Sequence, residues 1–445
     1  MLVRQILHPD LGCASYLIAD GGEAAVVDPK WEIDEYLSAA REAGAEIRHI
    51  LETHTHADPV SGRRRLADRT GARIHLPADP SQSGSDGLRD GDVISVGQAE
   101  LRAVAAPGHR PEHLAFTVHP SPGAPAAHLL SGDSLLLGGV ARPDLAVDGA
   151  EGATALFRTL QRLVEFEDDV ELWPAHVGGS LCGAASLNGE TSSTIALERE
   201  RNQLLRVSEP EFVAELTGQL PVRPPRVRSV VERNRAGAPD PEPLTELDAV
   251  ALRAEVEGRV RVMDLRSPEE FDAGHLTGSV NLAPASSGIG NRAGWATRED
   301  EAIVLIAEGA RDAAAAAELL RSAGIWNLAG FAVADPGAWD RTGLPVSRSE
   351  CWSPAQVQHG LQVGRLRLVD VRDDIEWEDG HVPGSVHLPL PVLRDGSELG
   401  IPGDLRVAVA CAAGARAALA ASIIRRAGYE PVVRMTDGIA SLLDA

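Results

Sequence analysis

Two histidines and an aspartate lie close together within residues 52–62 of the chain. His54 and His56 are two residues apart, and Asp58 follows two residues later. In an extended segment, residues at this spacing point to the same side, so both imidazoles can face one ion. Imidazole and carboxylate groups are common ligands of zinc and iron. The segment therefore predicts a metal site, provided that other parts of the chain supply further ligands.

Three later segments each bring one more group of this kind. His109 follows a Pro-Gly pair, Asp133 ends an apolar stretch, and His176 follows the sequence Trp-Pro-Ala. Each is expected where a strand gives way to a loop, which is the edge of a sheet where active sites are commonly assembled. Together with the first segment, they predict one metal centre built from distant parts of the chain.

The elements that must position these residues are short strands separated by polar turns. The expected strands are 24–27, 47–51, 115–118, 128–130 and 171–173. A helix is expected at 60–69, and further helices at 191–206 and 209–217. The stretch 236–243 is rich in Pro, Gly and acidic residues and is typical of a linker.

Past this linker the chain repeats itself. Residues 264–282 align without gaps on residues 370–388, with nine of 19 positions identical. Both copies are followed by an expected strand (303–306 and 407–410) and an Ala-rich helix. The repeat predicts two small α/β domains. We therefore divide the chain into domains at 1–240, 241–347 and 348–445.

The two copies differ in the loop after the later strand. The second copy has Cys411 at the strand end, with Gly414 and Arg416 leading into a helix, whereas the first has Ala307 or Glu308 there. A helix N-terminus and a nearby arginine favour a thiolate. Only the second copy is therefore expected to carry sulfur covalently.

Charge and composition narrow the classes of partner. The chain has 445 residues and a formal net charge of −23, which argues against nucleic acid and anionic membranes as partners. No apolar run approaches the length of a membrane span and no secretory signal pattern is present, so a cytoplasmic location is expected. Its four cysteines are too widely spaced for a disulfide framework. Self-association into a homo-oligomer stays open.

The motifs around His54, His109, Asp133 and His176 resemble those of the metallo-β-lactamase superfamily. Segments 132–144, 179–183 and 192–202 are similar to signatures of its persulfide dioxygenase branch. Over residues 1 to about 235, the resemblance implies an αββα fold.

The resemblance to this branch also implies one Fe(II) per chain, held by His54, His109 and Asp133. Two histidines and a carboxylate leave three adjacent coordination positions for substrate and dioxygen. The remaining polar residues would then orient the ligands or hold water. These residues are His56, Asp58 and His176.

Three residues keep alternatives open. If His56 binds the metal, the set becomes three histidines and an aspartate, and zinc becomes plausible. Pro59 stands where the superfamily usually has a histidine for a second metal, and a proline is expected at the first position of the helix 60–69. Cys182 is either a relay thiol close to the metal or a small buried residue.

The repeated segments resemble rhodanese (sulfurtransferase) domains, over about 245–345 and 352–445. The resemblance implies that Cys411 accepts sulfur as a persulfide, in a loop that also contains Gly414 and Arg416. The Asp-x-Arg pairs that open the two copies are expected to be structural ion pairs. The first copy is expected to be a spacer or docking module. The expected fold class is thus multi-domain α/β: an αββα metallo-β-lactamase fold followed by two rhodanese-like domains.

Together these features predict an enzyme of sulfide detoxification. One part would be a persulfide dioxygenase that uses Fe(II) and dioxygen to oxidise a low-molecular-weight thiol persulfide to sulfite. The other would be a thiosulfate:thiol sulfurtransferase. Two alternatives remain: a zinc-dependent glyoxalase II-type thioester hydrolase fused to rhodanese, and a non-enzymatic carrier of sulfane sulfur. The identity of the carrier thiol and the direction of sulfur transfer are not distinguished by the sequence.

Overall fold

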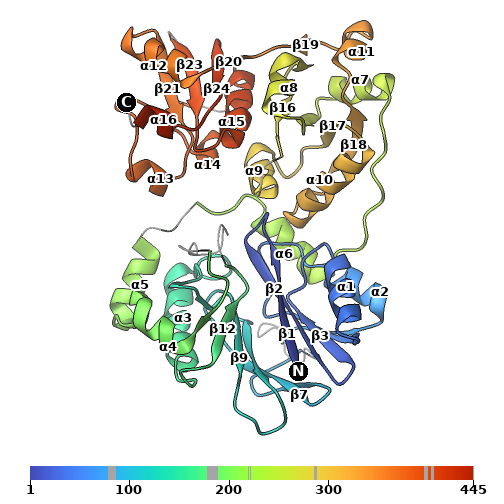
Figure 1. Ribbon diagram of the computed structural model, residues 1–445, viewed down its shortest axis with the longest axis vertical. Coiled ribbons are helices and arrows are strands. Elements are labelled where there is room, and N and C mark those ends of the chain that lie inside the picture. The colour runs from blue at the N-terminus through green and yellow to red at the C-terminus, as the bar shows by residue number, and fades with distance from the viewer. Residues whose placement is uncertain are drawn as a thin grey trace. The chain divides into compact units, whose positions relative to one another are not determined.

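The chain forms two compact units, which are described separately (Figure 1). Unit 1 comprises Met1–Pro241 with Ser322–Gly324, and unit 2 comprises Glu242–Arg321 with Ile325–Ala445. The computed structural model describes residues 1–78, 87–177, 189–218, 220, 222–284, 288–394, 399–401 and 405–443. Within these ranges, no helix combines the length and the apolar character that crossing a bilayer requires.

Unit 1 contains two sheets. The first has the strand order β1 (Leu2–His8), β2 (Cys13–Asp20), β3 (Glu23–Val27), β4 (Glu46–Leu51) and β5 (Arg73–His75). The second has the order β13 (Ser193–Thr194), β12 (Glu171–Pro174), β9 (His128–Gly132), β8 (Leu114–His119), β7 (Ala99–Ala105) and β6 (Val93–Val96). A short hairpin, β10 (Leu135–Leu136) with β11 (Gly139–Val140), follows β9. Since successive side chains of a strand point to opposite faces, each sheet can contribute to two cores.

The cores show how the layers are stacked. Ile18 and Leu51 of the first sheet share a buried cluster with Phe116 and Leu130 of the second, so the two sheets pack face to face. The opposite face of the first sheet packs on α1 (Asp34–Glu42) and α2 (Arg63–Thr70). The opposite face of the second sheet packs on α3 (Gly149–Leu163) and α5 (Glu209–Gly218). Unit 1 therefore has the expected αββα order of layers.

Two local expectations for unit 1 are wrong. Helix α2 begins at Arg63, with Gly62 as its N-cap, so Pro59 lies outside the helix and not at its first position. In place of one helix over 191–206, the chain forms β13, the helix α4 (Ile195–Arg201) and the 3₁₀ helix η1 (Gln203–Leu205). The interruption is at Asn202, whose side chain caps the 3₁₀ turn by accepting from the Leu204 N–H. Helix α6 (Val227–Ala236) completes unit 1.

Unit 2 contains two parallel sheets, one in each copy of the repeat. The first copy has the order β16 (Val280–Asn281), β14 (Arg261–Asp264), β17 (Ile303–Ala307) and β18 (Leu328–Val333). The second has the order β20 (Glu350–Trp352), β24 (Val432–Met435), β23 (Arg406–Ala410), β21 (Leu366–Asp370) and β22 (Val386–His387). A two-stranded pair joins β15 (His275–Leu276) to β19 (Val346–Ser347).

Helices cover these sheets. In the first copy they are α7 (Ala249–Glu257), α8 (Pro268–Ala273), α9 (Ile289–Ala296), α10 (Ala310–Ser322) and α11 (Pro336–Arg341). In the second copy they are α12 (Pro354–Gln362), α13 (Asp374–Glu378), α14 (Leu390–Leu393), α15 (Ala415–Arg426) and α16 (Ala440–Leu443). The two Asp-x-Arg pairs are ion pairs as expected: Asp264–Arg266 at 2.5 Å and Asp370–Arg372 at 2.7 Å.

The two copies also share one hydrophobic core. A single buried cluster includes Leu305 of the first copy and Val409 of the second. Polar contacts add to it: the Asn281 N–H donates to Ser422 Oγ at 3.1 Å. Arg434 is ion-paired with Asp272 at 3.0 Å, and this guanidinium is almost wholly buried. The first copy therefore takes part in the folding of the second.

Candidate metal centre and cysteine loop

The predicted ligands His54, His109 and Asp133 lie together at one edge of unit 1, in the loops after β4, β7 and β9. All three residues are buried. Asp133 Oδ2 lies 3.7 Å from His54 Nε2 and 3.6 Å from His109 Nε2. Strands of two different sheets thus deliver three potential ligand atoms to one point.

The donor atoms of these residues fit a metal ion. His54 Nε2, His109 Nε2 and Asp133 Oδ2 are buried and have no hydrogen-bond partner among the described residues. Their other polar atoms are bonded: Thr53 Oγ1 lies 2.9 Å from His54 Nδ1, and the Arg142 carbonyl lies 2.8 Å from His109 Nδ1. A buried polar atom without a partner is costly, so three of them facing one another indicate a cation-binding site.

The electrostatics of the three residues suit metal binding. Burial lowers the pKa of both His54 and His109, which favours the neutral imidazole that a metal requires. Burial alone would raise the pKa of Asp133, but the neighbouring His176 outweighs it and keeps the pKa below its usual range. The centre therefore presents two neutral nitrogens and one ionised oxygen.

His176 holds the aspartate in place. Its Nδ1 lies 2.6 Å from Asp133 Oδ1, and its Nε2 lies 3.3 Å from the thiol sulfur of Cys13. Burial would lower the pKa of His176, but the Asp133 carboxylate outweighs burial and raises it well above the usual value. The sequence analysis did not anticipate the contact of Cys13 with His176. The two residues are 163 positions apart and meet in an isolated antiparallel bridge, which local spacing does not indicate.

His56 turns away from the three ligands. Its Nε2 lies 3.1 Å from Asp28 Oδ1 and 3.1 Å from Glu52 Oε2, which makes a second buried group of potential ligands. Burial would lower the pKa of His56, but Asp28 and Glu52 raise it well above its usual range. Asp28 is itself fixed by Thr53, whose N–H and Oγ1–H donate to its two oxygens at 2.7 and 2.8 Å. Asp58 is buried nearby but belongs to neither group of ligands.

His113 is part of the centre and was missed by sequence reasoning. Its ring stacks on that of His54, with centroids 4.8 Å apart, and its Nε2 accepts the Asp133 N–H at 2.9 Å. Burial lowers its pKa to about 3, so the ring stays neutral and can accept this bond. Gly132 has φ +57°, and a Cβ there would lie 2.5 Å from His113 Nε2. Glycine is therefore required beside this histidine.

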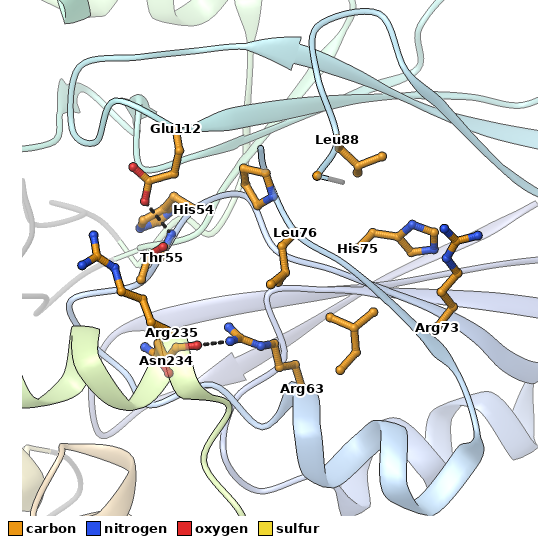
Figure 2. Close-up of a pocket in the computed structure, with 13 residues that line it drawn as sticks. His54, Thr55, Arg63, Arg73, His75, Leu76, Leu88, Glu112, Asn234 and Arg235 are labelled. Carbon is orange, nitrogen blue, oxygen red and sulfur yellow. Dashed lines mark hydrogen bonds between the residues drawn. The ribbon is translucent and has the colours of Figure 1, made fainter. Parts of the chain in front are cut away.

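A cavity of about 470 Å³ opens beside the metal centre (Figure 2). It reaches from His54 to the end of β5, and the exposed guanidiniums of Arg73 and Arg235 line it. On one side Glu112 accepts the Thr55 N–H at 3.3 Å. A small molecule in this cavity would have one end at the edge of the metal centre.

The cysteine loop of unit 2 is arranged to hold a sulfur anion. Cys411 directly follows β23 and is only 1% exposed. Its sulfur accepts the N–H groups of Gly414 at 3.0 Å and of Ala417 at 3.3 Å. Gly414 has φ +94°, a conformation that side chains disfavour, and this turn brings the start of α15 onto the sulfur. Among the hydrogen bonds of the described residues, none joins Arg416 to the sulfur; its guanidinium is paired with Asp373 and Glu376.

Two further predictions concern the loop of the first copy and Cys182, and only the first can be compared with the structure. In the first copy, Ala307 ends β17 and Glu308 follows it, so that loop has no thiol. Cys182 lies outside the described residues, so its expected roles as relay thiol or buried residue stay predictions.

Comparison with known proteins agrees with this geometry. Residues 8–176 match the family model described as the metallo-beta-lactamase superfamily. A hydroxyacylglutathione hydrolase of Polaromonas sp. (strain JS666) is 30% identical over 251 residues, which is 50% of this chain and 92% of the relative. The chain belongs to the metallo-β-lactamase superfamily. The C-terminal part of the chain matches the family model for a rhodanese-like domain twice, at residues 248–333 and 353–445.

Two further proteins are similar to this chain. The mitochondrial persulfide dioxygenase of Homo sapiens is 29% identical over 253 residues, covering 54% of this chain and 91% of the relative. A solved structure titled as a metallo-beta-lactamase from Staphylococcus aureus subsp. aureus COL has a TM-score of 0.66 at 29% identity, and covers 75% of this chain and 98% of that one. The expected fusion of a metallo-β-lactamase fold with two rhodanese-like domains is thereby confirmed. These families support an enzyme rather than a passive carrier.

Proposed function

We propose that the chain is a persulfide dioxygenase joined to a sulfurtransferase. In this proposal residues 1–240 oxidise a low-molecular-weight thiol persulfide to sulfite with dioxygen. Residues 348–445 transfer sulfane sulfur between thiosulfate and thiols through Cys411, and residues 241–347 have no thiol of their own. The observation that carries the proposal is the set of three buried, unbonded donor atoms of His54, His109 and Asp133, in a chain that also carries Cys411.

The ligand set supports iron. Fe(II) bound by two histidines and one carboxylate activates dioxygen and keeps adjacent positions open for substrate. In the proposed mechanism His54 and His109 donate as neutral imidazoles, and His176 keeps Asp133 ionised and correctly turned. The cavity beside His54 would orient the carrier thiol so that its persulfide end reaches the centre.

A thioester hydrolase is the second candidate, because the hydroxyacylglutathione hydrolase of Polaromonas sp. is similar over 92% of its length. A hydrolase with two metals would need further ligands beside the first set. His56 instead binds Asp28 and Glu52, and Pro59 offers no ligand atom. Asp28, Glu52 and His56 form a separate group of potential ligands, and Pro59 adds no ligand to the group of His54, His109 and Asp133, for which we propose a single metal and hence the dioxygenase.

The two candidates are separated by assays on one sample. Metal content, dioxygen uptake with a thiol persulfide and hydrolysis of a hydroxyacyl thioester are measured together. The proposal expects about one iron per chain, dioxygen uptake and sulfite formation, all lost in Asp133→Ala. Two zinc ions per chain with thioester hydrolysis and no dioxygen uptake would refute it.

Sulfur transfer has its own matched test. In the proposed step the Cys411 thiolate attacks the outer sulfur of the donor, and the leaving group departs with the electron pair of the broken S–S bond. Cys411→Ser is expected to abolish sulfur transfer and to leave persulfide-dependent dioxygen uptake intact. Cys351→Ser, at an exposed position in β20, is the control and should change neither.

A further inference from the structure

The arginine of the cysteine loop is already neutralised by acidic residues. Arg416 Nη1 lies 3.0 Å from Asp373 Oδ2 and 2.5 Å from Glu376 Oε2. Its Nη2 lies 2.8 Å from Glu376 Oε1, so the guanidinium and the Glu376 carboxylate form a two-pronged pair. Arg416 holds the pKa of Glu376 below its usual range despite partial burial, so the glutamate is ionised at neutral pH.

The remaining groups around Cys411 do not restore positive charge. Ala412 and Ala413, which follow the cysteine, carry no polar side chain. Arg372, the other guanidinium at the start of α13, is bound to Asp370 at 2.7 Å. Asp437 is exposed, and its neighbour Gly438 lies against the carbonyl of Ala412, so this further carboxylate is close to the cysteine loop. One guanidinium thus faces at least two carboxylates, and the loop entrance is net negative.

The first copy shows that this pairing is not simply part of the fold. The repeat alignment places Glu270 opposite Glu376 and Ser267 opposite Asp373. Glu270 accepts the N–H and the hydroxyl of Ser267 at 3.1 and 2.6 Å, which closes a capping box on α8. Within the described part of the chain, Glu270 has no ion pair with Arg311 of the corresponding loop. The glutamate therefore caps its helix in both copies, but it binds the loop arginine only where the cysteine is present.

We propose that Glu376 and Asp373 are specificity-determining residues of the Cys411 loop, which select sulfur donors and acceptors of low negative charge against dianions such as thiosulfate and sulfite. The inference rests on the proposed sulfur transfer by Cys411 and ranks its donors: thiosulfate is still used, but less well than a donor of lower charge. Two backbone N–H groups donate hydrogen bonds to the sulfur, and the charge of Arg416 is offset by its two carboxylate partners, so a second negative charge on the donor meets net repulsion. Exchange between persulfides and thiols is then the preferred use of the loop.

Two donors with the same chemistry and different charge test this. Thiosulfate is a dianion and methanethiosulfonate is a monoanion. In both, the Cys411 thiolate forms an S–S bond to the outer sulfur while the bond from that sulfur to the oxidised sulfur breaks. The electron pair leaves with sulfite in the first case and with methanesulfinate in the second, and Cys411 becomes a persulfide anion in both. No other oxidant or reductant is needed.

The experiment measures kcat/KM for both donors with one acceptor thiol, and the persulfide on Cys411 by intact mass. Glu376→Gln keeps an oxygen that can accept the Asp373 N–H, so the capping box at the start of α13 is retained. The thiosulfate-to-thiosulfonate ratio is expected to rise roughly three- to tenfold, the size of one interaction between unit charges about 4 Å apart in water. Because both rates come from one sample, a partly folded variant leaves the ratio unchanged.

Glu378→Gln is the matched control, since it removes the same charge from the exposed side of the same helix. An equal ratio in Glu376→Gln, Glu378→Gln and the unaltered protein would overturn the inference while Cys411 still becomes loaded. Failure of both donors to load Cys411 in the unaltered protein would overturn the proposed sulfur transfer together with the inference.

Discussion

The contact between His176 and Asp133 is the most direct test of the metal centre. In His176→Ala the carboxylate loses its 2.6 Å partner, while His54, His109 and Asp133 all stay in place. A hydrogen bond to an ionised carboxylate is worth about 1.5–3 kcal/mol. Loss of a residue that orients a ligand typically costs about 10–100-fold in metal affinity, which agrees with that energy. We therefore expect Fe(II) to bind His176→Ala with roughly 10–100-fold lower affinity and unchanged stoichiometry.

The assay is anaerobic competition for Fe(II) against a chelator of known affinity. His176→Gln keeps an amide that can donate to Asp133, so it should recover part of the loss. His119→Gln is the control, because His119 is a buried histidine bonded to Thr117 and to the Ala124 carbonyl, away from the centre. Unchanged affinity in His176→Ala would refute the orienting role. A loss as complete as that of His109→Ala would instead make His176 a ligand.

Three further outcomes are expected. Burial lowers the pKa of His275 to about 4 from 6.5, so the unfolded chain binds more protons between these values, and the free energy of unfolding should drop by about 3 kcal/mol as the pH is lowered from 6.5 to 4. In urea unfolding, His275→Gln should flatten this slope, and exposed His381→Gln should not. Gly414→Ala places a side chain at φ +94° and should cost about 1–3 kcal/mol in the loop and slow the loading of Cys411, and an unchanged loading rate would contradict the N–H arrangement. Removal of metal by a chelator should lower the free energy of unfolding of unit 1 by about 3–4 kcal/mol, if the metal had been at 100–1,000 times its Kd. In calorimetry only the transition of unit 1 should move to lower temperature, and a shift of both transitions would argue against a site within unit 1.

The grouping of His54, His109 and Asp133 could be predicted because each of them follows a strand. These strands are β4 of the first sheet and β7 and β9 of the second, and the loops after them meet where the two sheets pack face to face. The spacing of His54 and His56 was less informative, because it could not show that His56 faces carboxylates. Of these two carboxylates, Asp28 belongs to a segment without a motif, and Glu52 opens the segment 52–62, whose spacing does not show that it faces His56.

The residues that sequence reasoning missed are joined by contacts between distant segments. Cys13 meets His176 in an isolated bridge, and Asp28, which follows β3, meets Thr53, which follows the neighbouring β4. Pairing of this kind depends on which strands lie side by side, and local spacing does not contain that information. His113 is four residues from His109, but its role depends on the left-handed turn at Gly132, which only the fold reveals.

The common core of the two rhodanese-like copies has an evolutionary consequence. Leu305 and Val409 belong to one buried cluster, and Arg434 of the second copy is buried against Asp272 of the first. A gene that lacked the cysteine-free copy would therefore encode the copy with Cys411 with part of its apolar core exposed to solvent, and with Arg434 deprived of Asp272. Changes within the cysteine-free loop of the first copy should therefore be tolerated, whereas loss of the whole copy should not.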